Sequence, residues 1–264
     1  MTSKWRHLAV CLPLTIAMLP SSSHATECTS KSGDRRVALL ELYTSEGCNS
    51  CPPADRWLNA LPDRGIGSQQ AIPLAFHVDY WDYIGWKDRF AQPMFSQRQR
   101  MIAGRNQAAF IYTPQFVLDG KDYRQPWRRG DLDKQLRSVN QSPAKVSISV
   151  KQQRKENDLQ VSVQGRNLDT QTSHLFVALY QNRLHSEIKA GENAGKKLYH
   201  EFVVRELKGP FAIAPEQSMR NKVEFDLTPY VDASSLGLAV FAEDPDSGST
   251  MQAMAVALCE RAPN

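Results

Sequence analysis

The sequence carries little net charge and no repeated segment, and each lack removes a class of protein. It contains 32 Lys and Arg against 28 Asp and Glu, a net charge of +4. Residues 1–25 hold two of the basic residues and no acidic one, so the rest of the chain carries 30 − 28 = +2. Such a balance does not indicate a nucleic-acid partner. No internal repeat or low-complexity tract is present.

Long apolar stretches are also missing after residue 25, so no membrane span is predicted there. Near the N-terminus, Lys4 and Arg6 precede an apolar run over residues 8–19, which is too short to cross a bilayer. Small residues follow and end at Ala25. This pattern is typical of a secretory signal peptide, predicted over residues 1–25. We therefore expect a mature protein in the periplasm or secreted.

Cysteine is scarce, with five in the chain, and four of them lie beyond the predicted signal peptide. An even number in an exported protein favours disulfides. Cys48 and Cys51 form a local Cys-x-x-Cys pair. Cys28 and Cys259 remain, and if they pair they make a structural disulfide between the N-terminal arm and the last predicted strand. No second Cys-x-x-Cys exists and the histidines are scattered, so neither a metal site nor a cofactor is predicted.

The Cys-x-x-Cys pair stands between an apolar strand, residues 37–44, and a helical pattern that ends at Pro62. Prolines 52 and 53 fit only in the first helical turn, which puts Cys48 at or just before the helix N-terminus. The positive end of the helix dipole lowers a thiol pKa there. We predict thiol–disulfide exchange, with Cys48 as the exposed nucleophile and Cys51 as the resolving thiol. A purely structural disulfide is the main rival.

The order of elements predicts the fold class. A second apolar strand at 71–78, a basic helix at 93–107, a strand led by Pro114 and a helix at 131–140 follow the first strand and helix. This order is typical of a thioredoxin-like α/β domain, assigned to residues 26–141. Seven short, mostly alternating segments then predict an all-β antiparallel sandwich domain over residues 145–264. The segments are 146–150, 159–163, 175–180, 201–205, 223–227, 236–242 and 254–259.

Candidate substrate-binding residues lie in two places. In thioredoxin-like proteins a cis-proline lies beside the redox pair, and the residue before it binds peptide backbone. Thr113 and Pro114 occupy that place in chain order. Trp81 and Asp79, from an aromatic and acidic loop, are predicted to line the same groove; core packing and a hydrogen-bonded strand end are the alternatives. Arginines 98, 100 and 105 of the basic helix are expected to face solvent.

Three segments carry a family resemblance: residues 44–55 (TSEGCNSCPPAD), 77–88 (HVDYWDYIGWKD) and 112–115 (YTPQ). Together they resemble an uncharacterised bacterial secreted family, domain-of-unknown-function family 1223. The resemblance implies a thioredoxin-like fold and names no substrate.

The predicted function is thiol–disulfide exchange by an exported oxidoreductase, with periplasmic or secreted protein thiols and disulfides as partners. One alternative is a non-catalytic ligand- or partner-binding protein on a thioredoxin scaffold, with a bridge that resists reduction. Another is metal handling through Cys48, Cys51 and His77.

Overall fold

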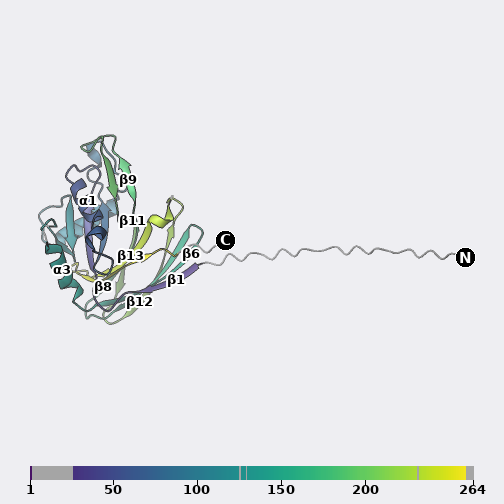
Figure 1. The fold of residues 1–264 in the computed structure, drawn as a ribbon. Helices are drawn as coiled ribbons and strands as arrows, with labels where there is room; N and C mark the ends of the chain where they lie inside the picture. The colour runs from purple at the N-terminus through teal and green to yellow at the C-terminus, as the bar shows by residue number, and fades with distance from the viewer. Residues whose placement is uncertain (2–25, 125, 129, 231, 260–264) are drawn as a thin grey trace.

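The structure is a computed structural model that describes residues 1, 26–124, 126–128, 130–230 and 232–259. The predicted signal peptide therefore lies outside the described residues, apart from Met1. Within the described part, fourteen β-strands accompany three α-helices (Figure 1). No helix in these ranges is long and apolar enough to cross a membrane. The chain is mostly β.

The larger sheet has eight strands and mixed directions. Strands β2 and β3 run parallel, β3 and β11 run parallel, and the other neighbouring strands are antiparallel. In order across the sheet the strands are β14 (Thr250–Ala257), β13 (Leu236–Glu243), β8 (Ser173–Gln181), β11 (Val203–Ile213), β3 (Ala71–His77), β2 (Ala38–Thr44), β4 (Gln115–Leu118) and β5 (Lys121–Asp122).

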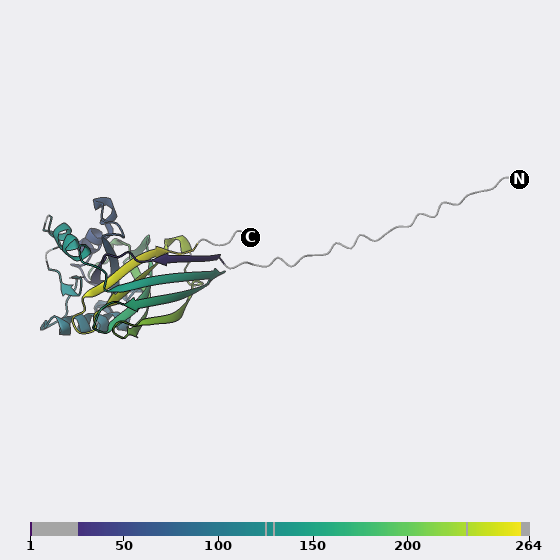
Figure 2. The same cartoon turned by 90° about the horizontal axis from the view of Figure 1, so that it is seen from below.

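A second, antiparallel sheet packs against the β14, β13, β8 and β11 part of the first. Its strands are β1 (Thr26–Lys31), β6 (Val146–Lys155), β7 (Asp158–Asn167) and β12 (Ser218–Asp226). Alternate residues of β6, among them Val146, Ile148 and Val150, point into the apolar layer between the sheets. Figure 2 shows the purple β1 lying along the teal strands of this sheet. A separate hairpin joins β9 (Leu184–Glu187) to β10 (Lys197–His200).

The helices cover the end of the larger sheet that contains β2, away from the second sheet (Figures 1 and 2). They are α1 (Pro52–Asn59), α2 (Pro93–Arg105) and α3 (Asp131–Asn140). Strand β2 is buried along its whole length because both of its faces are covered. Leu40 and Leu42 share a core with α1 and α3, whereas Leu39 and Tyr43 share a core with α2. This accounts for its nearly continuous apolar sequence.

The predicted fold class, an α/β thioredoxin-like domain followed by a separate all-β sandwich, is wrong. Val203 of β11 pairs in parallel with Ala75 of β3, so strands from both halves of the chain form one continuous sheet. The N-terminal arm, in which no strand was predicted, contributes residues 26–31 as a strand of the other sheet. An open strand edge exposes unpaired backbone donors and acceptors, and here β11 covers that edge of β3. Periodicity reports buried faces and does not report which strand covers an edge.

A buried arginine holds the two halves of the larger sheet together. Arg98 of α2 pairs with Glu41 of β2 and with Glu243 of β13, each at 2.8 Å. Its guanidinium also lies 5.1 Å from the ring centroid of Phe176. The expectation that Arg98 faces solvent is wrong, since its exposed fraction is 2%. The two carboxylates come from strands 202 residues apart (243 − 41), which no local pattern links.

Candidate functional site

The disulfide turn connects β2 to α1. Cys48 and Cys51 are bonded, with their Cα atoms 5.4 Å apart. Cys51 is the residue directly before α1, and Pro52 and Pro53 occupy the first two helical positions as the sequence predicts. Prolines carry no N–H, so two of the free donors that a helix start normally offers to an anion are missing. The helix N-terminus therefore stabilises a thiolate less than a proline-free helix would.

Both cysteines are buried, each with an exposed fraction of 0%. The expectation of an exposed Cys48 is thus wrong in this conformation. The two residues between them, Asn49 and Ser50, are exposed, and the Ser50 hydroxyl lies 3.3 Å from the Cys48 sulfur. A sulfur atom from another molecule can reach the bond only after a covering segment moves.

The loop between β9 and β10 holds the turn in place. The Asn193 side-chain amide donates to the carbonyl oxygens of Glu46, at 2.8 Å, and Cys48, at 2.9 Å. The carboxylate of Glu192 accepts a hydrogen bond of 3.3 Å from the backbone N–H of Asn49. Asn193 itself has an exposed fraction of 0%. The β9–β10 hairpin is thus hydrogen-bonded directly to the disulfide turn, although the two are far apart in sequence.

Glu46, two residues before Cys48, opens a buried ionisable cluster. Its carboxylate accepts a 2.8 Å hydrogen bond from the indole N–H of Trp86 and lies 3.2 Å from Nε2 of His200. Its backbone N–H donates to Oδ2 of Asp88 at 2.9 Å. Glu46 is wholly buried, so these groups replace the water that a free carboxylate would bind.

Two buried imidazoles complete the cluster. Nδ1 of His77 lies 2.7 Å from Oδ2 of Asp88, and the rings of His77 and His200 have centroids 5.0 Å apart. His77 faces α1 because it follows Ala71 and Ala75 on the same face of β3. Nε2 of His77 and Nδ1 of His200 are buried and have no hydrogen-bond partner within the protein. The cluster therefore contains two buried ring nitrogens that no other protein group contacts by a hydrogen bond.

The contacts shift the pKa values of these groups. Burial by itself lowers the pKa of His77, but the charge and hydrogen bond of Asp88 outweigh it and raise that pKa. Burial by itself raises the pKa of Asp88, but the charge and hydrogen bond of His77 lower it on balance. The pKa of Glu46 is likewise lowered, since the hydrogen bond to His200 and others oppose the effect of burial. The shifts favour an ion pair between His77 and Asp88 beside the disulfide turn.

Asp55 differs from the other acids of the cluster. It lies on α1, and its carboxylate accepts a 3.3 Å hydrogen bond from the hydroxyl of Thr44. Burial raises the pKa of Asp55, although the nearby imidazoles of His200 and His77 lower it in part. Its backbone N–H donates to the carbonyl oxygen of Cys51 at 3.1 Å, so this acid is one helical turn beyond the second cysteine.

The predicted substrate-binding residues divide into two groups. Thr113-Pro114 is a cis peptide, and the Thr113 hydroxyl accepts a 2.6 Å hydrogen bond from the indole N–H of Trp81. Trp81 also packs on Gly47, where a Cβ atom would lie 3.3 Å from Cβ of Trp81. These residues are thus brought together beside the disulfide turn. Asp79 is held elsewhere, since its carboxylate accepts a hydrogen bond from Ser96 of α2.

The other two cysteines also form a disulfide. Cys28 of β1 is bonded to Cys259, with Cα atoms 6.1 Å apart. The backbone N–H of Cys259 donates to the side-chain oxygen of Gln152 in β6 at 3.2 Å, so the bridge joins the edge of the smaller sheet to the chain after β14. This disulfide therefore connects the two packed sheets.

A metal centre finds no support among the described residues. Across residues 26–124, 126–128, 130–230 and 232–259, no group of three or more His, Cys, Asp and Glu is arranged to hold a metal ion. The alternative of metal handling through Cys48, Cys51 and His77 stays a prediction.

Sequence reasoning missed most of the buried cluster. Glu46 and Asp55 flank the cysteines and Asp88 ends a motif of the family resemblance, so these three carried a signal. His200 and Asn193 lie in a segment without any motif and carried none. Their role depends on a hairpin that reaches the turn from 145 residues away.

The fold and the site describe a mostly β protein with a buried Cys-x-x-Cys disulfide that lies next to a cluster of buried ionisable side chains. The chain belongs to the protein family of unknown function DUF1223, whose model matches residues 39–243. That match covers the resemblance motifs, the disulfide turn and the hairpin. No curated protein matches the chain.

Among solved structures, the chain is similar to a protein from Agrobacterium tumefaciens. The identity is 22%, the TM-score 0.62, and the match covers 88% of this chain and 99% of that one. It supports the fold alone. A domain of the outer membrane lipoprotein Omp28 from Porphyromonas gingivalis is more distant, with 13% identity, a TM-score of 0.31, and coverage of 45% of this chain and 92% of that one.

Proposed function

We propose that this protein is an exported thiol–disulfide oxidoreductase that uses the Cys48–Cys51 pair. The observation that carries the proposal is the buried cluster behind the disulfide, where His77 and His200 each keep a ring nitrogen without a partner. Reducing a disulfide to two thiols takes up two electrons and two protons. A purely structural bridge has no use for a proton source at this place, whereas an exchanging pair does. Export rests on the signal-peptide pattern of residues 1–25.

The exchange proceeds in two displacements. A thiolate of the partner attacks the Cys48 sulfur, the Cys48–Cys51 bond breaks, and Cys51 leaves as a thiolate. The partner's second thiolate then attacks the partner's sulfur atom of the mixed disulfide, and Cys48 leaves as a thiolate. The partner's dithiol has become a disulfide and the pair has become two thiols, so the two protons that the partner's thiols release balance the two that the pair takes up. The reverse sequence reduces a partner.

A trapping experiment tests the proposal. Cys51→Ser keeps Cys48 but removes the resolving thiol, so mixed disulfides with periplasmic or secreted proteins should accumulate. Cys48→Ser is the matched control and should trap none. The Cys48–Cys51 pair should also equilibrate with glutathione at a reduction potential between about −120 and −270 mV, the range of catalytic pairs. An absence of both mixed disulfides and glutathione exchange contradicts the proposal.

One observation favours a second candidate, a non-catalytic binding protein. Both cysteines have an exposed fraction of 0%, as expected for a bridge that only stiffens a turn. That candidate predicts a potential below about −300 mV and an unchanged function when both cysteines are replaced by serine. The same potential measurement therefore separates the two candidates.

A further inference from the structure

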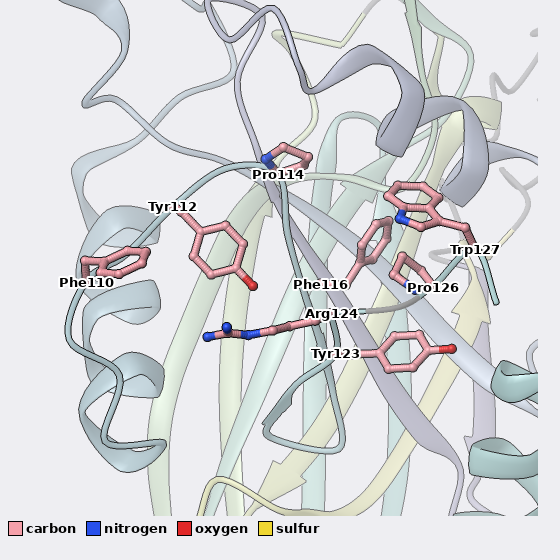
Figure 3. Close-up of a pocket in the computed structure, with 8 residues that line it drawn as sticks. All are labelled: Phe110, Tyr112, Pro114, Phe116, Tyr123, Arg124, Pro126 and Trp127. Carbon is pink, nitrogen blue, oxygen red and sulfur yellow. The ribbon is translucent and has the colours of Figure 1, made fainter.

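A pocket outside the buried cluster lies beside the cis-proline Pro114 (Figure 3). Its cavity volume is about 270 Å³, and its walls are mainly aromatic rings and prolines. Figure 3 shows the rings of Phe110 and Tyr112 on one side, those of Phe116 and Trp127 on the other, and Arg124 reaching between them. Sites for drug-sized ligands are larger, roughly 300 Å³ and above. The pocket therefore suits a single side chain better than a cofactor.

Two of the apolar walls stand open to solvent. The exposed fraction is 68% for Phe110 and 55% for Trp127. Large exposed aromatic side chains gathered at one place mark binding surfaces. The inner wall consists of packed rings, since the ring of Phe116 lies 4.9 Å from that of Trp57 on α1 and 5.9 Å from that of Trp127.

The polar groups of the pocket are also fixed in advance. Asp122 accepts hydrogen bonds from the hydroxyl of Tyr112, at 2.7 Å, and from Nε of Arg124, at 2.6 Å. Burial and the carboxylate of Asp122 raise the pKa of Tyr112, so this hydroxyl stays protonated. The side chain of Arg124 is 69% exposed and brings a positive charge to the mouth of the pocket. An acidic group bound there can accept hydrogen bonds from the guanidinium group of Arg124.

A series of contacts links the pocket to the disulfide turn. Pro114 forms part of its wall, and the adjacent Thr113 is hydrogen-bonded to Trp81. Trp81 in turn packs on Gly47, the residue before Cys48. The contacts of Thr113, Trp81 and Gly47 therefore lie between the pocket and Cys48.

We infer that the pocket binds a large apolar side chain, aromatic by preference, of the peptide that exchanges with Cys48, and that Arg124 pairs with an acidic residue beside it. This inference rests on the proposed function. It names the substrate class: partner proteins whose reactive cysteine has an aromatic and an acidic residue close by in sequence.

The test uses a short peptide with one cysteine, held as a mixed disulfide with glutathione, and either Phe or Ala nearby. In reduced protein, the Cys48 thiolate attacks the peptide sulfur and glutathione thiolate leaves. Cys51 then displaces the peptide thiolate and the Cys48–Cys51 bond forms again. The Phe peptide should react with a second-order rate constant roughly tenfold above that of the Ala peptide, because an aromatic ring is buried on binding.

Variants locate the preference. Phe110→Ala and Trp127→Ala should each abolish most of the Phe preference, while Leu168→Ala, which removes an exposed apolar side chain elsewhere, should keep it. The rate with glutathione disulfide, which lacks the side chain, should not change in any of them. An equal rate for the Phe and Ala peptides in the wild-type protein overturns the inference and leaves the proposed function standing.

A binding measurement distinguishes failure of the pocket inference from failure of the proposed function. Peptides with Ser in place of Cys are titrated into the protein by calorimetry, so that no exchange is involved. Tighter binding of the Phe peptide supports the pocket even if no disulfide reacts, in which case the proposed function alone fails. Equal binding of the Phe and Ala peptides overturns the inference. A Glu neighbour should bind more tightly than a Lys neighbour, and Arg124→Gln should remove that difference; no difference in the wild-type protein contradicts the role of Arg124.

Discussion

The side-chain amide of Asn193 donates a 2.9 Å hydrogen bond to the carbonyl oxygen of Cys48 from 145 residues further along the chain. A second bond from the same amide goes to Glu46, so one asparagine fixes the backbone on both sides of Gly47. The β9–β10 hairpin thereby becomes part of the disulfide site. Access to the buried sulfurs is expected to depend on how often this hairpin separates from the disulfide turn.

Replacing Asn193 by alanine should make the Cys48–Cys51 disulfide more reactive. Two hydrogen bonds of about 1 kcal/mol each are lost, so reduction by dithiothreitol should become roughly tenfold faster or more. Stopped-flow measurement of thiol release checks this. Asn221→Ala, which alters a half-buried position in β12 far from the disulfide turn in sequence, is the control and should react like wild type. An unchanged rate in Asn193→Ala would mean that other segments limit access.

Replacing Asp55 by asparagine should stabilise the protein at neutral pH. The raised pKa of Asp55 means that the folded state binds this proton more tightly than the unfolded state. The free energy of unfolding therefore falls as pH rises above about 3.9, the ordinary pKa of Asp, towards the folded pKa. Asparagine carries no such cost and can still accept the bond from Thr44.

Urea denaturation at several pH values measures this effect. The advantage of Asp55→Asn should be present at pH 7 and should vanish below about pH 3.9, where both states hold the proton. Asp34→Asn, at an exposed position, should show no comparable trend. A variant less stable than wild type at pH 7 would show that the charged form of Asp55 is favoured in the fold.

Replacing Arg98 by methionine should destabilise the protein strongly. The change leaves Glu41 and Glu243 buried with one partner less, and breaking a buried pair costs about 3–5 kcal/mol. Arg100→Met, at an exposed position of the same helix, should stay within about 0.5 kcal/mol of wild type. Denaturant unfolding of both variants gives the comparison. Equal losses in the two would refute the role of Arg98 in joining β2 to β13.

Removing the Cys28–Cys259 disulfide should lower stability and leave exchange chemistry intact. The bridge closes a loop of 231 residues, and the loss of such a native disulfide costs about 2–5 kcal/mol. The double variant Cys28→Ser, Cys259→Ser should melt at a lower temperature, while its Cys48–Cys51 potential stays that of wild type. A shift in that potential would show that the two disulfides are coupled.

Local sequence patterns located many of the regular elements. The helix predicted over residues 131–140 has those bounds, and the strand predicted over 71–78 is observed as Ala71–His77. Each of these segments has its own apolar spacing and its own end signals, which act over a few residues. The strands that were missed, β1, β9 and β10, are short and largely polar, so alternation of polarity did not mark them.

The sequence by itself determined the Cys-x-x-Cys turn, the prolines that start α1 and the family, because each is written in neighbouring residues. The tertiary structure alone decided that β11 pairs with β3, that Arg98 is buried between Glu41 and Glu243, and that Asn193 and His200 reach the disulfide turn. These contacts join residues more than 50 positions apart. Their energy depends on burial and on which strand covers which edge, and no local spacing encodes either.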